Sequence, residues 1–128
     1  MRPVDLPGSY LVLDLGNACP LRCRHCIQSE PEKHRFFDLW GQMDPQIATD
    51  LLDELQGEGR HFHALILFWL GEPLLHPEFL AIYERAAQAA AAGVFHRIEV
   101  HTNAVRLTPE IGEAVVQCRG VEQRWHFS

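Results

Sequence analysis

The chain has 128 residues, of which 47% are hydrophobic and 22% charged, a composition that excludes intrinsic disorder for the chain as a whole. Its formal net charge of -6, without a Lys- and Arg-rich block, argues against DNA binding and disfavours RNA. The longest apolar run, 64–70, is too short to span a membrane, and the N-terminus lacks the layout of a signal peptide, so we expect a cytoplasmic protein without a membrane partner.

The first predicted element is a strand over residues 10–15, which ends at the turn signal Gly16–Asn17. A cysteine-rich loop follows and continues into a long connection, 28–43. The aromatic residues of this connection would either close over a site or simply pack the loop onto the core; they are Phe36, Phe37 and Trp40. Asp44 and Pro45 then give the start signal of a helix that the glycines at 57 and 59 end.

The remainder of the chain repeats this alternation. Residues 63–70 form a continuous apolar run, typical of a strand covered on both faces, and an amphipathic helix begins at Phe79 and ends at Gly93. A third strand is predicted over 97–101, a third helix starts at Thr108–Pro109, and a fourth strand covers 121–127. The alternation predicts an α/β fold with a parallel sheet and right-handed crossovers.

Unusual residues follow each of the first three predicted strands. The cysteines come after the first strand, Glu72 after the second, and Thr102 and Asn103 after the third. Because the carboxyl ends of parallel strands share one edge of a sheet, and active sites lie there, we expect these residues to meet.

The cysteine loop has the spacing C-x3-C-x2-C, with Cys19, Cys23 and Cys26. Thiolates favour iron–sulfur clusters and zinc, and three of them leave one iron of a 4Fe–4S cluster without a protein ligand. The alternative is a structural zinc site with His25 or His34 as the fourth ligand. The fourth cysteine, Cys118, shares a helical stripe with apolar residues and is predicted to be a core residue.

The cysteine spacing and two later segments together resemble the radical S-adenosylmethionine (radical SAM) superfamily. Residues 70–77, Leu-Gly-Glu-Pro-Leu-Leu-His-Pro, are similar to its Gly-Gly-Glu-Pro motif and the extension that follows, and residues 101–104 are similar to its Thr-Asn-Gly segment. The resemblance covers Tyr10 to Ser128. Two departures are Leu70 in place of the first glycine, and His25 where the family usually has an aromatic ring.

The resemblance implies a partial TIM-like barrel of about six βα units, of which four strands and three helices are present here. Residues 1–128 would then be the N-terminal portion of the radical SAM core domain, without the second half of the barrel. We expect either a fragment or a truncated product that needs a partner, able to bind a cluster but with poor turnover.

The resemblance also implies the chemistry. A 4Fe–4S cluster on the three cysteines would bind S-adenosylmethionine at its free iron and cleave it reductively to a 5′-deoxyadenosyl radical, which abstracts hydrogen from a substrate. Glu72 would accept a hydrogen bond from the methionyl ammonium, unless it is only a capping or surface carboxylate. The other candidate cofactor contacts are Gly71 and Pro73 at the turn, His25 beside the adenine, and Thr102, Asn103 and Ser128.

Two functions from different classes follow. The first is a radical enzyme, served by an electron donor such as flavodoxin or ferredoxin and acting on an unidentified peptide or small molecule. The second is a non-catalytic iron–sulfur or zinc-binding protein. The residues that separate them are Gly71-Glu72-Pro73, because only the first function requires them.

Overall fold

The computed structural model describes residues 8–30 and 41–128, so that His34 and the aromatic residues Phe36, Phe37 and Trp40 lie outside the described residues. Strands and helices alternate along the described chain. Their bounds are β1 (Tyr10–Val12), α1 (Pro45–Gly57), β2 (Phe62–Leu67), α2 (Phe79–Ala91), β3 (Phe95–Thr102), α3 (Pro109–Gln117) and β4 (Glu122–Phe127). Two single turns of 3-10 helix, η1 (Ile27–Ser29) and η4 (Pro73–Leu75), follow β1 and β2.

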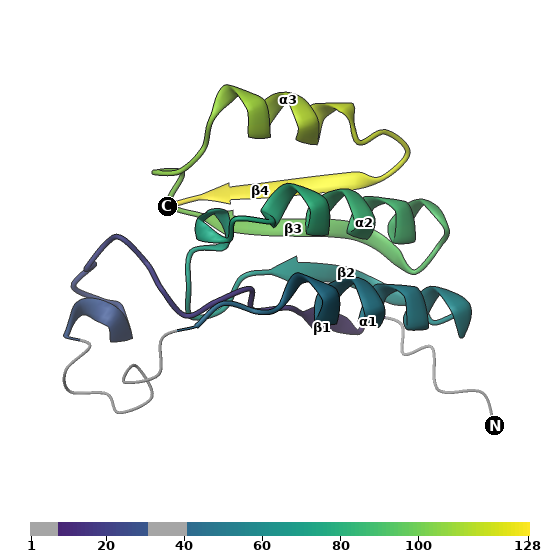
Figure 1. The fold of residues 1–128 in the computed structure, drawn as a ribbon, viewed down its shortest axis with the longest axis horizontal. Helices are drawn as coiled ribbons and strands as arrows, with labels where there is room; N and C mark the ends of the chain where they lie inside the picture. Colours follow the sequence, from purple (N-terminus) through teal and green to yellow (C-terminus); the bar gives the residue numbers. More distant parts are fainter. Residues whose placement is uncertain (1–7, 31–40) are drawn as a thin grey trace.

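The strands form one sheet in the order β1-β2-β3-β4, and each neighbouring pair is parallel. Helix α1 contacts α2, and α2 contacts both α3 and β3, so the helices cover one face of the sheet (Figure 1). The predicted α/β class is therefore confirmed, and sequential parallel order with helices on one side is the arrangement of part of a TIM-like barrel. No helix of the described residues is long and apolar enough to cross a membrane.

The core lies between the sheet and the helices. On β3, Ile98 and Val100 are fully buried in this layer. Their alternating neighbours Arg97, Glu99 and His101 belong to the opposite face of the strand, where Arg97 donates to Glu99 over 3.2 Å. The sheet therefore has an apolar face toward the helices and a polar face away from them.

The helix starts agree with the predicted caps. The Asp44 side chain accepts a hydrogen bond from the backbone N–H of Gln46 at 2.9 Å, and the Thr108 hydroxyl accepts one from Ile111 at 3.3 Å. In both helices a proline occupies the first turn, where its missing N–H costs nothing.

The first two strands are shorter than predicted at their carboxyl ends. The sequence predicts strands to residue 15 and residue 70, whereas β1 ends at Val12 and β2 at Leu67. Beyond the two strand ends, a side chain replaces the backbone as the hydrogen-bond acceptor. The Asp14 carboxylate, after β1, accepts the backbone N–H of Leu70, after β2, at 3.2 Å. The apolar pattern continues into this region, but the hydrogen bonds of Leu70 go to side chains of the adjoining loops.

Candidate functional site

Three loops meet at the carboxyl edge of the sheet. The cysteine loop follows β1, the Glu72 turn joins β2 to α2, and residues 103 and 104 follow β3. The backbone N–H of Glu72 donates to Ala18 O at 2.8 Å, next to the first cysteine. The backbone N–H of Asn103 donates to Glu72 Oε2 at 2.9 Å. Glu72 therefore makes hydrogen bonds to both of the other loops.

The Glu72 carboxylate is buried, with 6% of the residue exposed, and it is held by three hydrogen bonds. Its Oε1 accepts from the Thr102 hydroxyl and from the backbone N–H of Leu74, the latter at 3.2 Å. Its Oε2 accepts from Asn103. A carboxylate offers about four acceptor positions, so Oε2 keeps acceptor capacity beyond these contacts. Glu72 is thus the cap of η4 and, at the same time, fixed in one orientation.

Gly71 brings the Glu72 turn into direct backbone contact with the cysteine loop. A Cβ atom at this position would lie 1.9 Å from Gly16 O and 2.7 Å from Gly16 C. No side chain fits there, which explains the glycine by close approach of two backbones. The sequence associates this glycine with a ligand, whereas the structure places the protein's own Gly16 against it. Pro73 is buried in the first turn of η4.

The cysteine loop is held at its two ends. Asn103 Nδ2 donates to Cys19 Sγ at 3.4 Å, and the backbone N–H of Gln28 donates to Cys26 Sγ at 3.5 Å. Cys19 and Cys26 are half-buried, whereas Cys23 is exposed. Arg22 Nη1 donates to Cys19 O at 2.7 Å and supports the loop backbone between the first two cysteines.

Three cysteine thiolates on one loop are ligands of the kind that an iron–sulfur cluster takes, and they also suit zinc, which needs about four ligands around one point. Within residues 8–30 and 41–128, no three His, Cys, Asp or Glu side chains lie close enough together to hold a metal ion. The hydrogen bonds from Asn103 to Cys19 Sγ and from Gln28 to Cys26 Sγ are of the kind that tune the sulfurs of a cluster. Of the proposed zinc partners, His25 is exposed and His34 is outside the described residues.

The other residues predicted to contact the cofactor are Thr102, Asn103 and Ser128, and they differ in burial and in their hydrogen bonds. Thr102 is 2% exposed, and its hydroxyl donates to Glu72 and accepts from the backbone N–H of Ala104 at 3.0 Å. Asn103 Oδ1 accepts the backbone N–H of Val105 at 3.0 Å. Ser128 is exposed, and its backbone N–H donates to Thr102 O at 3.1 Å, which extends the pairing of β3 with β4. Thr102 and Asn103 therefore support the site through Glu72 and Cys19.

Gln28 is a residue of the site that the sequence analysis does not identify. It is 1% exposed, and its Nε2 donates to Asn17 O at 3.1 Å and to Leu70 O. A polar residue two positions after a cysteine is typical of an exposed loop, so no sequence signal marks it as buried.

Cys118 lies apart from the other cysteines, as predicted. It caps the C-terminal end of α3, which runs back toward the amino ends of the strands, and it packs partly buried against the core. Burial raises the pKa of the Cys118 thiol, which suits a structural residue.

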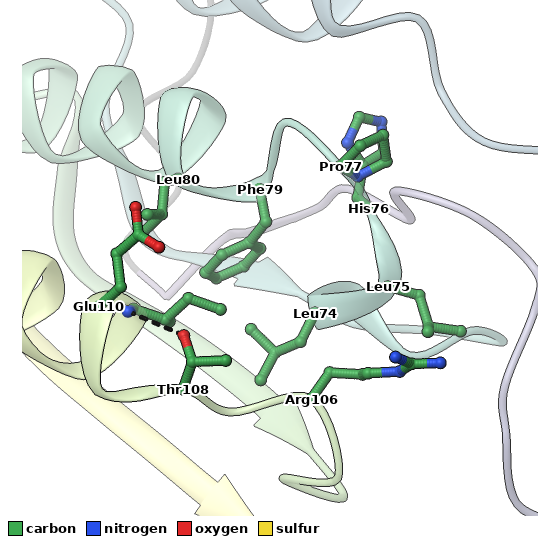
Figure 2. A pocket seen from close by; sticks show the side chains of 10 residues that line it. Leu74, Leu75, His76, Pro77, Phe79, Leu80, Arg106, Thr108 and Glu110 are labelled. Atoms are coloured by element: carbon green, nitrogen blue, oxygen red, sulfur yellow. Dashed lines mark hydrogen bonds between the residues drawn. The ribbon is translucent and has the colours of Figure 1, made fainter.

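A separate open groove of about 540 Å³ lies between the starts of α2 and α3 (Figure 2). Its walls include Leu74, Leu75, His76 and Pro77, the residues that follow the Glu72 turn, and Arg106 lies at its rim. His76 is 5% exposed, makes a 2.7 Å hydrogen bond to Met43 O through Nε2, and accepts the backbone N–H of Glu78 at 3.0 Å. The histidine therefore joins the turn to the segment before α1.

A parallel βα sheet that carries a three-cysteine loop after its first strand and a buried glutamate after its second defines a class of iron–sulfur α/β proteins. The family model of the radical SAM superfamily matches residues 13–121, and the chain belongs to this superfamily. The predicted family is therefore confirmed.

Two curated relatives are similar over most of this chain. Mycofactocin maturase MftC from Mycobacterium tuberculosis is 30% identical over 114 residues, which cover 86% of this chain and 25% of the relative. A tungsten-containing aldehyde ferredoxin oxidoreductase cofactor-modifying protein from Pyrococcus furiosus is 28% identical over 105 residues, covering 80% of this chain and 26% of that protein. The chain thus spans about a quarter of the length of these relatives.

Solved structures agree on the fold. The crystal structure of BtrN in complex with AdoMet and 2-DOIA superposes with a TM-score of 0.73 at 18% identity, covering 98% of this chain and 46% of that one. BtrN in an open conformation gives a TM-score of 0.68 at 17% identity, with 96% of this chain and 58% of that one covered. At these identities the likeness supports the fold.

Proposed function

We propose that Cys19, Cys23 and Cys26 hold a 4Fe–4S cluster, and that the protein cleaves S-adenosylmethionine reductively at the carboxyl edge of the sheet. Membership of the superfamily and the names of the relatives make this an enzyme of the radical SAM kind. The observation that carries the finer proposal is the buried Glu72 carboxylate, hydrogen bonded to the loop after β3 and, through its backbone, to the cysteine loop.

The protein residues would bind and orient the cofactor. When bound on Cys19, Cys23 and Cys26, a 4Fe–4S cluster would supply the electron for reductive cleavage of S-adenosylmethionine. Glu72 would accept the methionyl ammonium at Oε2, where a charge-assisted hydrogen bond is stronger than a neutral one. His25, exposed on the cysteine loop, would stack on the adenine. Asn103 and Ser128 would contact the ribose or the methionyl carboxylate.

The substrate is proposed to be a peptide or a small molecule. The names of the relatives, a maturase and a cofactor-modifying protein, support this class. A flavodoxin or ferredoxin is proposed as the electron donor. The cytoplasmic location and the assignment of residues 1–128 to the first part of a core domain stay predictions.

The proposal is tested by anaerobic reconstitution of the full chain with iron and sulfide. The parent chain is expected to bind about four irons, and Cys19→Ala, Cys23→Ala and Cys26→Ala are each expected to lose most of them. Cys118→Ala is the matched control, because this cysteine caps the C-terminal end of α3 and its loss should leave the iron content unchanged.

Activity is measured on the same samples, by adding dithionite and S-adenosylmethionine and assaying 5′-deoxyadenosine. Nucleoside formed by the parent chain and absent from the three cysteine variants supports the proposal. Bound zinc in place of iron, or an iron content that survives all three substitutions, contradicts it.

A further inference from the structure

Gln28 stands out as a polar side chain that is almost completely buried beside the cysteine loop. It belongs to η1, the single turn that begins directly after Cys26, and only 1% of it is exposed. Burial of an amide is unfavourable unless its hydrogen bonds are replaced. The hydrogen bonds that compensate for burial of the Gln28 amide therefore indicate its role.

The side chain joins two segments that lie far apart in the sequence. Its Nε2 donates to Asn17 O at 3.1 Å, two residues before the first cysteine. The same nitrogen donates to Leu70 O, which is 42 residues away and immediately precedes Gly71 and Glu72. Both N–H groups of the amide are thus used, one on the cysteine loop and one on the segment between β2 and η4.

The backbone of Gln28 contacts the sulfur of the third cysteine. Its N–H donates to Cys26 Sγ at 3.5 Å, and this bond closes the turn that orients Cys26. One residue therefore fixes the entry to the loop, its last sulfur and the strand end that leads to Glu72.

The geometry is not explained by stability alone. Gln28 Oε1 is buried and has no hydrogen-bond partner within the described part of the chain. An unpaired buried acceptor costs about 1–3 kcal/mol, which an apolar side chain of the same length would avoid. The glutamine therefore retains an unfavourable atom while its nitrogen holds the loops together.

We propose that Gln28 is a positioning residue, which holds Cys26 and the cysteine loop against the end of β2 and so sets the cluster in one orientation relative to Glu72. This inference rests on the proposed function, since it requires a cluster on the three cysteines. Hydrogen bonds to cysteine sulfur and the geometry around it set the reduction potential of an iron–sulfur cluster. Loss of the Gln28 amide should therefore change the cluster itself as well as the stability of the chain.

The test compares Gln28→Met, which keeps the length but removes both hydrogen-bonding groups, with Gln28→Asn, which keeps the amide but is one methylene too short to reach both carbonyls. Gln42→Met is the matched control, because Gln42 also donates Nε2 to a carbonyl, Leu75 O at 3.2 Å, but is exposed. Each full chain is reconstituted anaerobically, and three quantities are measured: the electron paramagnetic resonance spectrum after reduction, the midpoint potential, and the rate of iron loss to a chelator.

Without the side-chain bonds to Asn17 O and Leu70 O, η1 is held less firmly, and the backbone N–H of residue 28 donates less well to Cys26 Sγ. Both Gln28 variants are therefore expected to show an altered spectrum, a more negative potential and about 10-fold faster iron loss, with no change in Gln42→Met. A variant that is less stable but has the parent spectrum and potential would reduce Gln28 to a structural residue and overturn the inference. If Gln28→Met does not fold, Gln28→Asn, which still carries the amide, decides on the same measurements. A parent chain that binds no cluster would refute the proposed function. A parent chain with a cluster, and variants with the parent spectrum and potential, would refute only the positioning role of Gln28.

Discussion

The layer between the sheet and the helices differs from the carboxyl edge of the sheet in what holds it together. In the layer, apolar side chains such as Leu65, Ile82 and Ile98 are completely buried, and their packing needs no particular partner atom. At the edge, Glu72, Thr102 and Gln28 are also buried, but each is joined to atoms of other loops by hydrogen bonds. Apolar packing therefore stabilises the layer, whereas hydrogen bonds between loops fix the positions of the site residues at the edge.

This difference sets the tolerance of each region to substitution. An apolar layer accepts changes of shape at moderate cost when the total volume is kept. A hydrogen-bonded edge leaves buried polar atoms unpaired when one partner is removed, and each of these carries a desolvation penalty. Substitutions matched in size should therefore be more damaging at the edge than in the helices.

The largest effect is expected for Gly71→Ala. The added Cβ would lie 1.9 Å from Gly16 O, a backbone atom that moves only if the two loops separate. We expect the free energy of unfolding to fall by at least about 3 kcal/mol, measured by urea denaturation of the metal-free chain. The control is Gly112→Ala in α3, where the Cβ meets open space and should stabilise the helix by about 0.5–1 kcal/mol. Equal changes in the free energy of unfolding for Gly71→Ala and Gly112→Ala would contradict the expected difference between the edge of the sheet and the helices.

The next effect concerns pH and the packed layer. Tyr83 of α2 is fully buried, and its hydroxyl donates to Gln123 of β4. Burial raises the pKa of Tyr83 to about 12. The unfolded tyrosine loses its proton near pH 10, so the stability contributed by the buried neutral form is complete below that pH. It is lost as the pH rises through about 12, by about 2–3 kcal/mol in total.

This prediction is checked by chemical denaturation of the parent chain and Tyr83→Phe across the alkaline range. The phenylalanine variant has no proton to lose, so its stability should decline less between pH 10 and 12. Parallel declines in the two chains would show that Tyr83 does not cause the loss.

The smallest effect is expected for Thr102→Val, which keeps the shape but removes the hydroxyl that donates to Glu72 and accepts from Ala104. Unfolding should become easier by about 1–2 kcal/mol, while Thr102→Ser, which restores the hydroxyl, should recover most of this. Thermal or urea denaturation measures both. A valine variant as stable as the parent would mean that the Glu72 carboxylate does not depend on this bond.

The sequence predicts the elements of the layer because they depend on local patterns. Proline and cap residues locate the start of α1 at Pro45 and of α3 at Pro109, and apolar periodicity identifies the buried faces of the helices. The three cysteines are found in the same way, since their spacing is local. The polar edge is only partly predictable, because its contacts join residues far apart in the chain.

Gln28 and Gly71 illustrate this limit. The amide of Gln28 bonds to a carbonyl 42 residues away, and nothing near position 28 indicates it. The motif around Gly71 marks the residue as special, but only the structure shows that Gly16 is what it approaches. Likewise, the apolar run through residue 70 predicts a longer β2, whereas the hydrogen bonds of Leu70 to Asp14 and Gln28 replace the ladder.

The central claim is that three thiolates hold a cluster beside a carboxylate already fixed to receive S-adenosylmethionine. It is tested most directly by the electron paramagnetic resonance spectrum of the reduced, reconstituted chain, recorded with and without S-adenosylmethionine. The spectrum is expected to change on addition of the sulfonium compound in the parent chain and much less in Glu72→Gln. A cluster whose spectrum is identical in its presence and absence would contradict the account.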